Sequence, residues 1–116
     1  MEPTTAQVFN EDSALEVVGG DREFMGTILG IFLEELPKAI ETLESAVADR
    51  NTDVVGKAAH KLKGEAGAVG AEAVWAAARD LNDRARDHEV DSFDEMWAAL
   101  RSEIERLIPV IRPYCE

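Results

Sequence analysis

One histidine, His60, lies in the least ordinary stretch of this chain, the run KAAHKLKGEAGAVG at residues 57–70. The residues that surround it are three of the protein's four lysines, Lys57, Lys61 and Lys63, and three glycines that would share its helix face, Gly56, Gly64 and Gly67. Each glycine lowers helix stability by about 0.5–1 kcal/mol relative to alanine. The pattern therefore predicts that something approaches the backbone beside the histidine. Glycines tolerated on a solvated face, beside an incidental histidine, are the simpler alternative.

The chemistry open to His60 can be narrowed by what each kind of site requires. A metal site on a helix needs converging ligands, usually spaced as H-x-x-x-H or H-E-x-x-H. The second histidine, His88, is far along the chain, and the lysines would repel a cation. Nucleophilic hydrolysis needs a serine or cysteine beside the histidine. The helix face around His60 has neither, and the lone Cys115 is near the C-terminus. Without a glycine-rich strand-to-helix phosphate loop, we do not expect the chain to bind ATP by itself.

Phosphoryl transfer fits the residues around the histidine better. An exposed imidazole is partly neutral near pH 7, and its ring nitrogen can attack phosphorus directly. Nearby lysines would offset the roughly two negative charges of a phosphoryl group. Glycines would leave room for the active site of a partner to reach the ring. The residues thus predict a phosphoryl carrier whose partner supplies the catalysis.

The elements that must position this histidine are helices, and no segment reads as a strand. A short first helix is predicted to end at Gly19 and Gly20, which tolerate a left-handed turn. Asp21 is the expected N-cap of the next segment, 22–50, in which Pro37 should kink the helix or divide it in two. Apolar residues recur there at three- and four-residue steps, which predicts one buried face made of Phe24, Ile28, Ile31, Phe32, Leu36, Ala39, Ile40, Leu43 and Val47.

A third helix, beginning near Asn51 or Thr52, carries the histidine. Its apolar residues form a stripe of Val55, Ala58, Ala59, Leu62, Ala66 and Val69. Because His60 falls almost opposite the centre of that stripe, its ring should face solvent.

Two more helices follow. The fourth is expected over about 71–87, and its inner residues are Val74, Ala77, Ala78, Leu81 and Ala85. The fifth opens at Ser92, where Glu95 completes a capping-box pattern. Its apolar residues are Met96, Trp97, Leu100, Ile104, Leu107, Ile108 and Ile111, before Pro109 and Pro113 weaken the helix.

Four long amphipathic segments with short connections predict an all-α fold, an antiparallel four-helix bundle with a short extra N-terminal helix as a lid. At 116 residues the chain is expected to be a single domain, 1–116. A net charge of −12 argues against nucleic acid or an anionic membrane as a partner. No apolar run could span a bilayer, and the start MEPTTAQ is no signal peptide. The single cysteine fits a reducing compartment, so we expect a cytoplasmic protein, and without a heptad seam we expect a monomer.

The run AAHKLKGEAGAVGAEAVWAAARDLN resembles the signature of the histidine-containing phosphotransfer (HPt) domains of bacterial phosphorelays. That signature joins an H-x-[LI]-K-G core to small residues and a Gly-Ala turn into the next helix. The matching positions are His60, Leu62, Lys63, Gly64, Gly70, Ala71 and the closing Leu81. A Phe-Leu-x-x-x-Pro run on the preceding helix is also similar to the family, so the resemblance covers about residues 8–108.

The resemblance implies a phosphotransfer intermediate without kinase activity of its own. His60 would take a phosphoryl group from a receiver-domain aspartate and pass it to another receiver. Lys63 would hold the phosphoryl oxygens, and Gly64 would leave room for them. The implied partners are response-regulator receiver domains and, as a further candidate, a hybrid histidine kinase. No cofactor is implied for this chain, since Mg²⁺ would belong to the receiver.

Two positions depart from the family's pattern. Asn82 stands where members often have Glu or Gln, a residue that can hydrogen-bond the imidazole and fix its orientation, and Asn is shorter. Glu65 replaces a small residue, and its charge could tune the choice of partner or slightly disfavour phosphate. The residues expected to meet the docking receiver are Lys57, Lys61, Gly56 and Gly67.

Several other residues have simpler interpretations. His88 is expected to be a solvated surface residue, and Trp75 and Trp97 are expected to serve in packing or at the bundle rim. Met25 and Phe9 belong either to the core or to an apolar docking patch.

Two other functions stay open at this point. One is a helical adaptor with an HPt-like fold that binds its partner without phosphate. The other is the phospho-accepting module of a larger histidine kinase, although a chain that starts with Met and spans one domain favours a free-standing protein.

Overall fold

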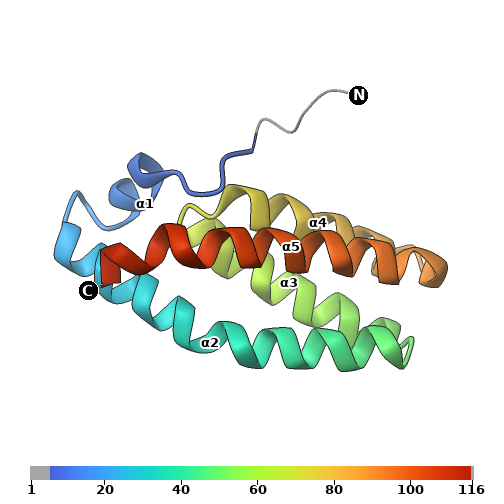
Figure 1. Cartoon of the computed structure of the whole chain (residues 1–116). Coiled ribbons are helices and arrows are strands. Elements are labelled where there is room, and N and C mark those ends of the chain that lie inside the picture. The colour runs from blue at the N-terminus through green and yellow to red at the C-terminus, as the bar shows by residue number, and fades with distance from the viewer. Residues whose placement is uncertain (1–5, 116) are drawn as a thin grey trace.

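A computed structural model describes residues 6–115 of the chain. The described residues form five α-helices, α1 (Glu11–Val17), α2 (Arg22–Ala48), α3 (Thr52–Ala68), α4 (Glu72–Arg86) and α5 (Phe93–Ile111), with 3-10 turns at Val90–Ser92 and Arg112–Cys115. The four long helices run in alternating directions, and α5 returns to pack against α2 (Figure 1). The short α1 lies at one end of the bundle. The predicted all-α four-helix bundle with an extra N-terminal helix is confirmed.

The interior of the bundle is apolar, and residues 6–115 bury no polar or charged side chain. Large side chains fill the space next to α2 and α5, among them Leu29, Leu36, Leu43, Phe93, Leu100 and Ile104. Between α3 and α4, many of the buried residues are alanines, namely Ala59, Ala66, Ala78 and Ala85. Because the distance between helix axes depends on the side chains at the contact, these alanines let α3 and α4 approach closely.

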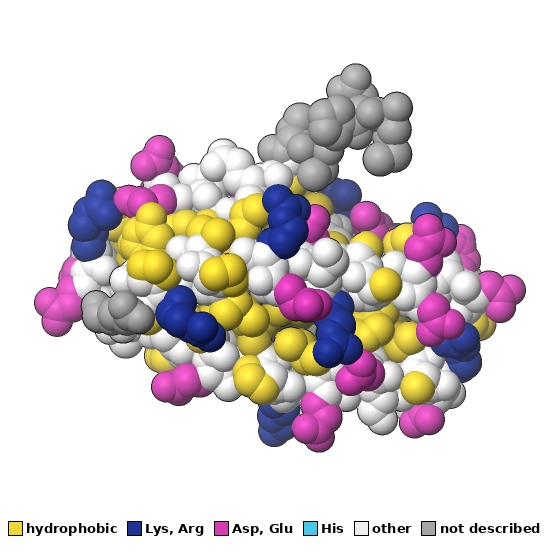
Figure 2. Space-filling model, in the orientation of Figure 1, with side chains coloured by type: hydrophobic (Ala, Val, Ile, Leu, Met, Phe, Trp, Pro, Cys, Tyr) yellow, Lys and Arg dark blue, Asp and Glu magenta, His cyan; other side chains and the backbone are white. Residues whose placement is uncertain are grey.

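The surface carries charges of both signs. On the face shown in Figure 2, acidic and basic side chains alternate with scattered apolar ones, and neither histidine is visible. Within residues 6–115, no helix is both long and apolar enough to cross a membrane.

The helix α2 is continuous through Pro37, so of the two predicted outcomes, a kink or a division in two, the division does not occur. The ribbon bends along its length in Figure 1, as expected for the alternative, a kinked helix. Pro37 is exposed, which lets water replace the backbone hydrogen bond that the proline ring removes.

The buried face of α2 also differs from the prediction. Phe24 and Ile31 are each 51% exposed, whereas Met25 and Leu29 are buried. The buried stripe is rotated toward these two residues, so that part of the apolar pattern lies beside the core and not in it. Met25 is therefore a core residue, and Phe9 packs against Tyr114 with ring centroids 5.2 Å apart.

Three helix starts are capped by side-chain oxygens that accept backbone N–H groups, those of Asn10, Asp21 and Asn51. The capping box predicted for Ser92 and Glu95 is wrong. A 3-10 turn precedes α5, and within it the Ser92 hydroxyl donates backward to the carbonyl of Glu89 at 2.7 Å. At its other end α5 continues through Pro109 to Ile111, and Pro113 falls in the following turn.

The turn between α3 and α4 depends on Gly70. Its φ of 74° is left-handed, and a Cβ at this position would lie 2.5 Å from the carbonyl oxygen of Asn10. That carbonyl belongs to the segment before α1, and the Asn10 N–H donates to the Gly70 carbonyl at 2.8 Å. A residue other than glycine would be strained here and would also displace this segment.

The C-terminal 3-10 turn closes the α1 end of the bundle. Tyr114 donates a hydrogen bond to Glu11, which also forms an ion pair with Arg22 at 2.9 Å. These contacts tie α1, α2 and the end of the chain together at the end of the bundle that holds the Gly70 turn.

Candidate functional site

His60 lies on the outer surface of α3 and is exposed, as its position opposite the apolar stripe predicted. It borders a shallow hollow between α3 and α4, here called the His60 hollow, lined by Thr52, Asp53, Gly56, Lys57, His60, Asn82, Ala85, Arg86 and His88. No residue of 6–115 forms a hydrogen bond to the imidazole. The ring is thus held only by its backbone and is open to a partner.

The lysines around His60 do not form one patch. Lys61 borders a different depression, the α2–α3 groove, lined by Glu34, Glu35, Lys38, Ala39, Thr42, Val54, Lys57, Ala58, Lys61, Leu62 and Glu65. Lys57 borders both depressions and pairs with Asp53 at 3.2 Å. Lys63, one turn beyond the histidine, is half-buried. The groove therefore gathers Lys38, Lys57 and Lys61. Lys63 lines neither depression, but it is four residues before Gly67, which faces Trp75, and so it lies on the α4 side of α3.

The three glycines that share the face of His60 have three different surroundings. A Cβ on Gly56 would lie 3.5 Å from the Cβ of Ala85, an ordinary packing distance between α3 and α4. A Cβ on Gly64 would have nothing within 4 Å, so this position is open. A Cβ on Gly67 would lie 3.3 Å from Cδ1 of Trp75. Only Gly64 offers free space to an approaching partner.

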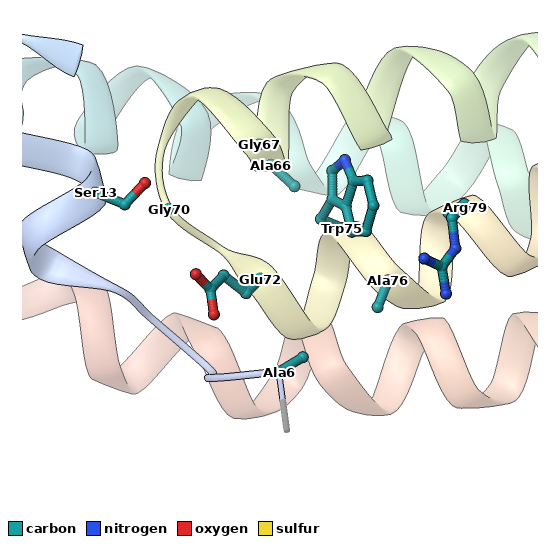
Figure 3. Close-up of a pocket in the computed structure, with 9 residues that line it drawn as sticks. All are labelled: Ala6, Ser13, Ala66, Gly67, Gly70, Glu72, Trp75, Ala76 and Arg79. Atoms are coloured by element: carbon teal, nitrogen blue, oxygen red, sulfur yellow. The ribbon is translucent and has the colours of Figure 1, made fainter. Parts of the chain in front are cut away.

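Trp75 covers the end of this glycine stripe (Figure 3). The residue is 37% exposed, and the guanidinium carbon of Arg79 lies 5.0 Å from the ring centroid, a cation–π contact. The pocket drawn in Figure 3 is lined by Ala6, Ser13, Ala66, Gly67, Gly70, Glu72, Trp75, Ala76 and Arg79. The expected rim position of Trp75 is confirmed, and Trp97, 7% exposed, serves in packing.

The side chain of Asn82, on α4, contacts the backbone of α3. Its side-chain Nδ2 donates to the carbonyl of Gly56 at 3.0 Å, and both residues border the His60 hollow. Within the described chain, the amide forms no hydrogen bond to the imidazole. Glu65, the other departure from the family pattern, borders the α2–α3 groove and lies on the opposite flank of α3 from this amide.

Five residues of the His60 hollow were not assigned to the site from the sequence, namely Thr52, Asp53, Ala85, Arg86 and His88. Arg86 pairs with Asp83 at 3.2 Å. His88 is exposed, as predicted, but it ends α4 with a left-handed φ of 57° at the mouth of the hollow. The sequence contained a signal for this placement. The third and fourth helices were predicted to be antiparallel and joined by a turn at residue 70, so residues equally far from that turn lie opposite each other, and the end of α4 faces the start of α3.

The hollow has no constellation for metal chemistry. Among residues 6–115, no three His, Cys, Asp or Glu side chains lie close enough together to hold a metal ion. The hollow itself contains two imidazoles, those of His60 and His88. One helical turn beyond His60, outside the lining of the hollow, are the half-buried Lys63 and the open position at Gly64.

Comparison with protein families gives one match to this chain. A family model described as the Hpt domain matches residues 27–108, which include all of α3 and α4 and therefore the whole His60 hollow. Neither the curated proteins nor the solved structures that were compared contain a match.

Proposed function

Because the chain belongs to the Hpt domain family, whose members are phosphotransfer modules of phosphorelays, we propose that His60 is its phosphoryl acceptor. The observation that carries this proposal is the exposed imidazole of His60, which no residue of 6–115 engages. A ring nitrogen that already served a core hydrogen bond would not be available as a nucleophile. Hpt domains are phosphocarriers rather than catalysts.

The proposed reaction exchanges one phosphorus bond for another. The unprotonated ring nitrogen of His60 attacks the phosphorus of a receiver-domain aspartyl phosphate. An N–P bond forms, the aspartyl O–P bond breaks, and the receiver's carboxylate leaves with the electron pair. Transfer to a second receiver reverses these steps. In this scheme Mg²⁺ belongs to the receiver.

Lys63 and Gly64 are proposed to surround the phosphoryl group once it is bound to His60. Both follow His60 by about one helical turn, so their positions lie next to the ring along α3. A half-buried lysine can pack its stem against the helix pair and keep its ammonium at the surface, where it would contact phosphoryl oxygens. The open space at Gly64 would hold those oxygens or the receiver's own backbone.

The partners of Hpt domains are receiver domains and histidine kinases, and we propose that Lys57 and Lys61 contact an acidic surface of such a partner. Both side chains are exposed, and both border the α2–α3 groove next to the histidine. Gly56 and Gly67 support docking indirectly, because their faces are occupied by Ala85 and Trp75.

The test of the proposal is transfer from a phosphorylated receiver domain. The wild-type protein should acquire an acid-labile, alkali-stable label, and His60→Gln should acquire none. The matched control is His88→Asn, which removes the second histidine of the same hollow and which the left-handed conformation tolerates. It should be labelled like the wild type.

Three results would count against the assignment. Label that survives in His60→Gln would exclude His60 as the acceptor, and label lost in His88→Asn would move the site. A wild-type protein that no member of a receiver panel can label would favour a phosphate-independent adaptor.

A further inference from the structure

The side chain of Asn82 holds the turn of backbone that leads to His60. Its Nδ2 donates to the carbonyl oxygen of Gly56 at 3.0 Å. In the helical pattern of α3 the same carbonyl is four residues before His60, and so it accepts the backbone N–H of the histidine. One oxygen thus receives two donors, one from the histidine and one from the neighbouring helix.

The close packing of α3 and α4 makes this contact possible. Gly56 has no side chain, and the space of a Cβ there is in contact with Ala85, one turn after Asn82 on α4. The short asparagine can therefore reach a main-chain atom across the helix interface. A carbonyl only accepts hydrogen bonds, so the amide nitrogen must face Gly56.

We propose that Asn82 is a positioning residue that fixes His60 through the backbone of Gly56 and not through a bond to the ring. Its effect on transfer rests on the proposed acceptor role of His60. The structural part of the inference concerns only the backbone. A fixed α3 turn keeps the imidazole at one distance from Lys63 and Gly64 while a partner docks.

Three variants separate this role from the ring-orienting role expected from the family. Asn82→Ala removes the donor. Asn82→Asp keeps the shape but has no donor, and it sets a carboxylate against a carbonyl. Asn51→Ala is the matched control, since Asn51 caps α3 through the N–H of Val54 at 3.2 Å and has no contact with Gly56.

In the transfer assay we expect Asn82→Ala and Asn82→Asp to react about fivefold to tenfold more slowly, because small displacements of a reacting group cost this much or more. Asn51→Ala should stay close to the wild-type rate. If Asn82 instead oriented the ring, Asn82→Asp would react faster than Asn82→Ala and at least as fast as the wild type, because a carboxylate accepts a hydrogen bond from imidazole better than an amide does. Asn82→Asp at or above the wild-type rate would overturn the proposal.

An NMR measurement on the unphosphorylated protein tests the backbone part independently of any transfer. The carbonyl carbon of Gly56 and the amide of His60 should shift in both Asn82 variants and hold still in Asn51→Ala. If they hold still in all three, the inference is wrong even when His60 is the acceptor. If they shift while the wild-type protein is never labelled, the positioning contact stands and the proposed function falls.

Discussion

The two flanks of α3 differ in how they are built. On the α4 side the helices pack closely through alanines, and the backbone itself is contacted at Gly56. On the α2 side the packing is less close, and the α2–α3 groove is lined by longer charged side chains such as Lys38, Lys61 and Glu65. His60 borders the first flank and not the second.

This difference separates the two requirements of a phosphoryl carrier. A nucleophile must have a fixed position, which a closely packed pair of helices provides. Recognition of changing partners needs only complementary charge, which flexible lysines on an open groove provide. Replacing the lysines of the two flanks one at a time tests this separation most directly.

The largest effect should come from the lysine on the α4 flank. Lys63→Ala should slow phosphoryl transfer by about tenfold or more, because the charged donor proposed for the phosphoryl oxygens is lost. Lys61→Ala removes the same charge from the α2 flank and should slow transfer by only about threefold or less, and less still in high salt. Stopped-time labelling with one receiver would give both rates. Equal losses would remove the distinction between the flanks.

Next in size is the open position on α3. Gly64→Ala should raise the free energy of unfolding by about 0.5–1 kcal/mol, since alanine is the better helix former. It should also slow transfer severalfold, because the methyl group occupies the space proposed for the phosphoryl oxygens. Gly30→Ala in α2 is the control, with no atom within 4 Å of its Cβ position. It should give a similar stability gain with an unchanged rate, whereas an unchanged rate in Gly64→Ala would refute the role of the open space.

A smaller effect, on stability alone, is expected at the mouth of the His60 hollow. His88→Gly should stabilise the protein by about 1 kcal/mol, because it relieves a left-handed residue that has a side chain. Arg50 ends α2 in the same conformation, φ 54°, but it forms a bidentate ion pair with Asp94, at 3.0 and 2.7 Å. Arg50→Gly should therefore gain less in a denaturant titration. Slower transfer in His88→Gly would extend the functional flank to the end of α4.

The smallest effect should come from a region remote from both flanks, the contact of Tyr114 with Glu11. The hydrogen bond from Tyr114, and then the one from Arg22, lower the pKa of Glu11, and the bond to Glu11 raises the pKa of Tyr114. The carboxylate's contribution to stability is thus present above its ordinary pKa of 4.5 and is lost as the pH falls through the lowered value. The contribution of the Tyr114 hydroxyl to stability is present below its ordinary pKa of 10.0 and is lost as the pH rises through the raised pKa.

Thermal unfolding of Tyr114→Phe across this range would test the assignment. The variant should be slightly less stable than the wild type between these limits and should match it in acid. Its transfer rate should equal that of the wild type. A stability difference that persists in acid would mean that the contact does not depend on the Glu11 carboxylate.

The fold was predictable because helix periodicity, caps and glycine turns are local signals. The stripe of α3 alone was enough to place His60 at the surface. The same local signals gave wrong predictions where a residue keeps the expected spacing but makes a different contact in the folded protein. Phe24 and Ile31 keep the apolar spacing of α2 but lie beside the core, and Ser92 keeps the capping spacing but bonds backward to Glu89.

The sequence singles out the candidate site residues one by one, but it does not give their arrangement in space. Gly56, Gly64 and Gly67 look equivalent in the sequence, and only the position of α4 separates a packed, an open and a covered glycine. Likewise, the identity of Asn82 says that it can donate and accept, but its actual acceptor depends on the distance between two helices. That distance is set by buried side chains far apart in the sequence.

The alanines between α3 and α4 therefore have a consequence for variation in this protein. They set how closely α3 and α4 approach beside the His60 hollow, although they are buried and, of the set, only Ala85 lines the hollow. A single larger residue, such as Val in place of the fully buried Ala78, would wedge the helices apart. Signalling through such a variant would weaken while every surface residue stayed the same, so a screen confined to exposed positions would overlook the residues that set the gap.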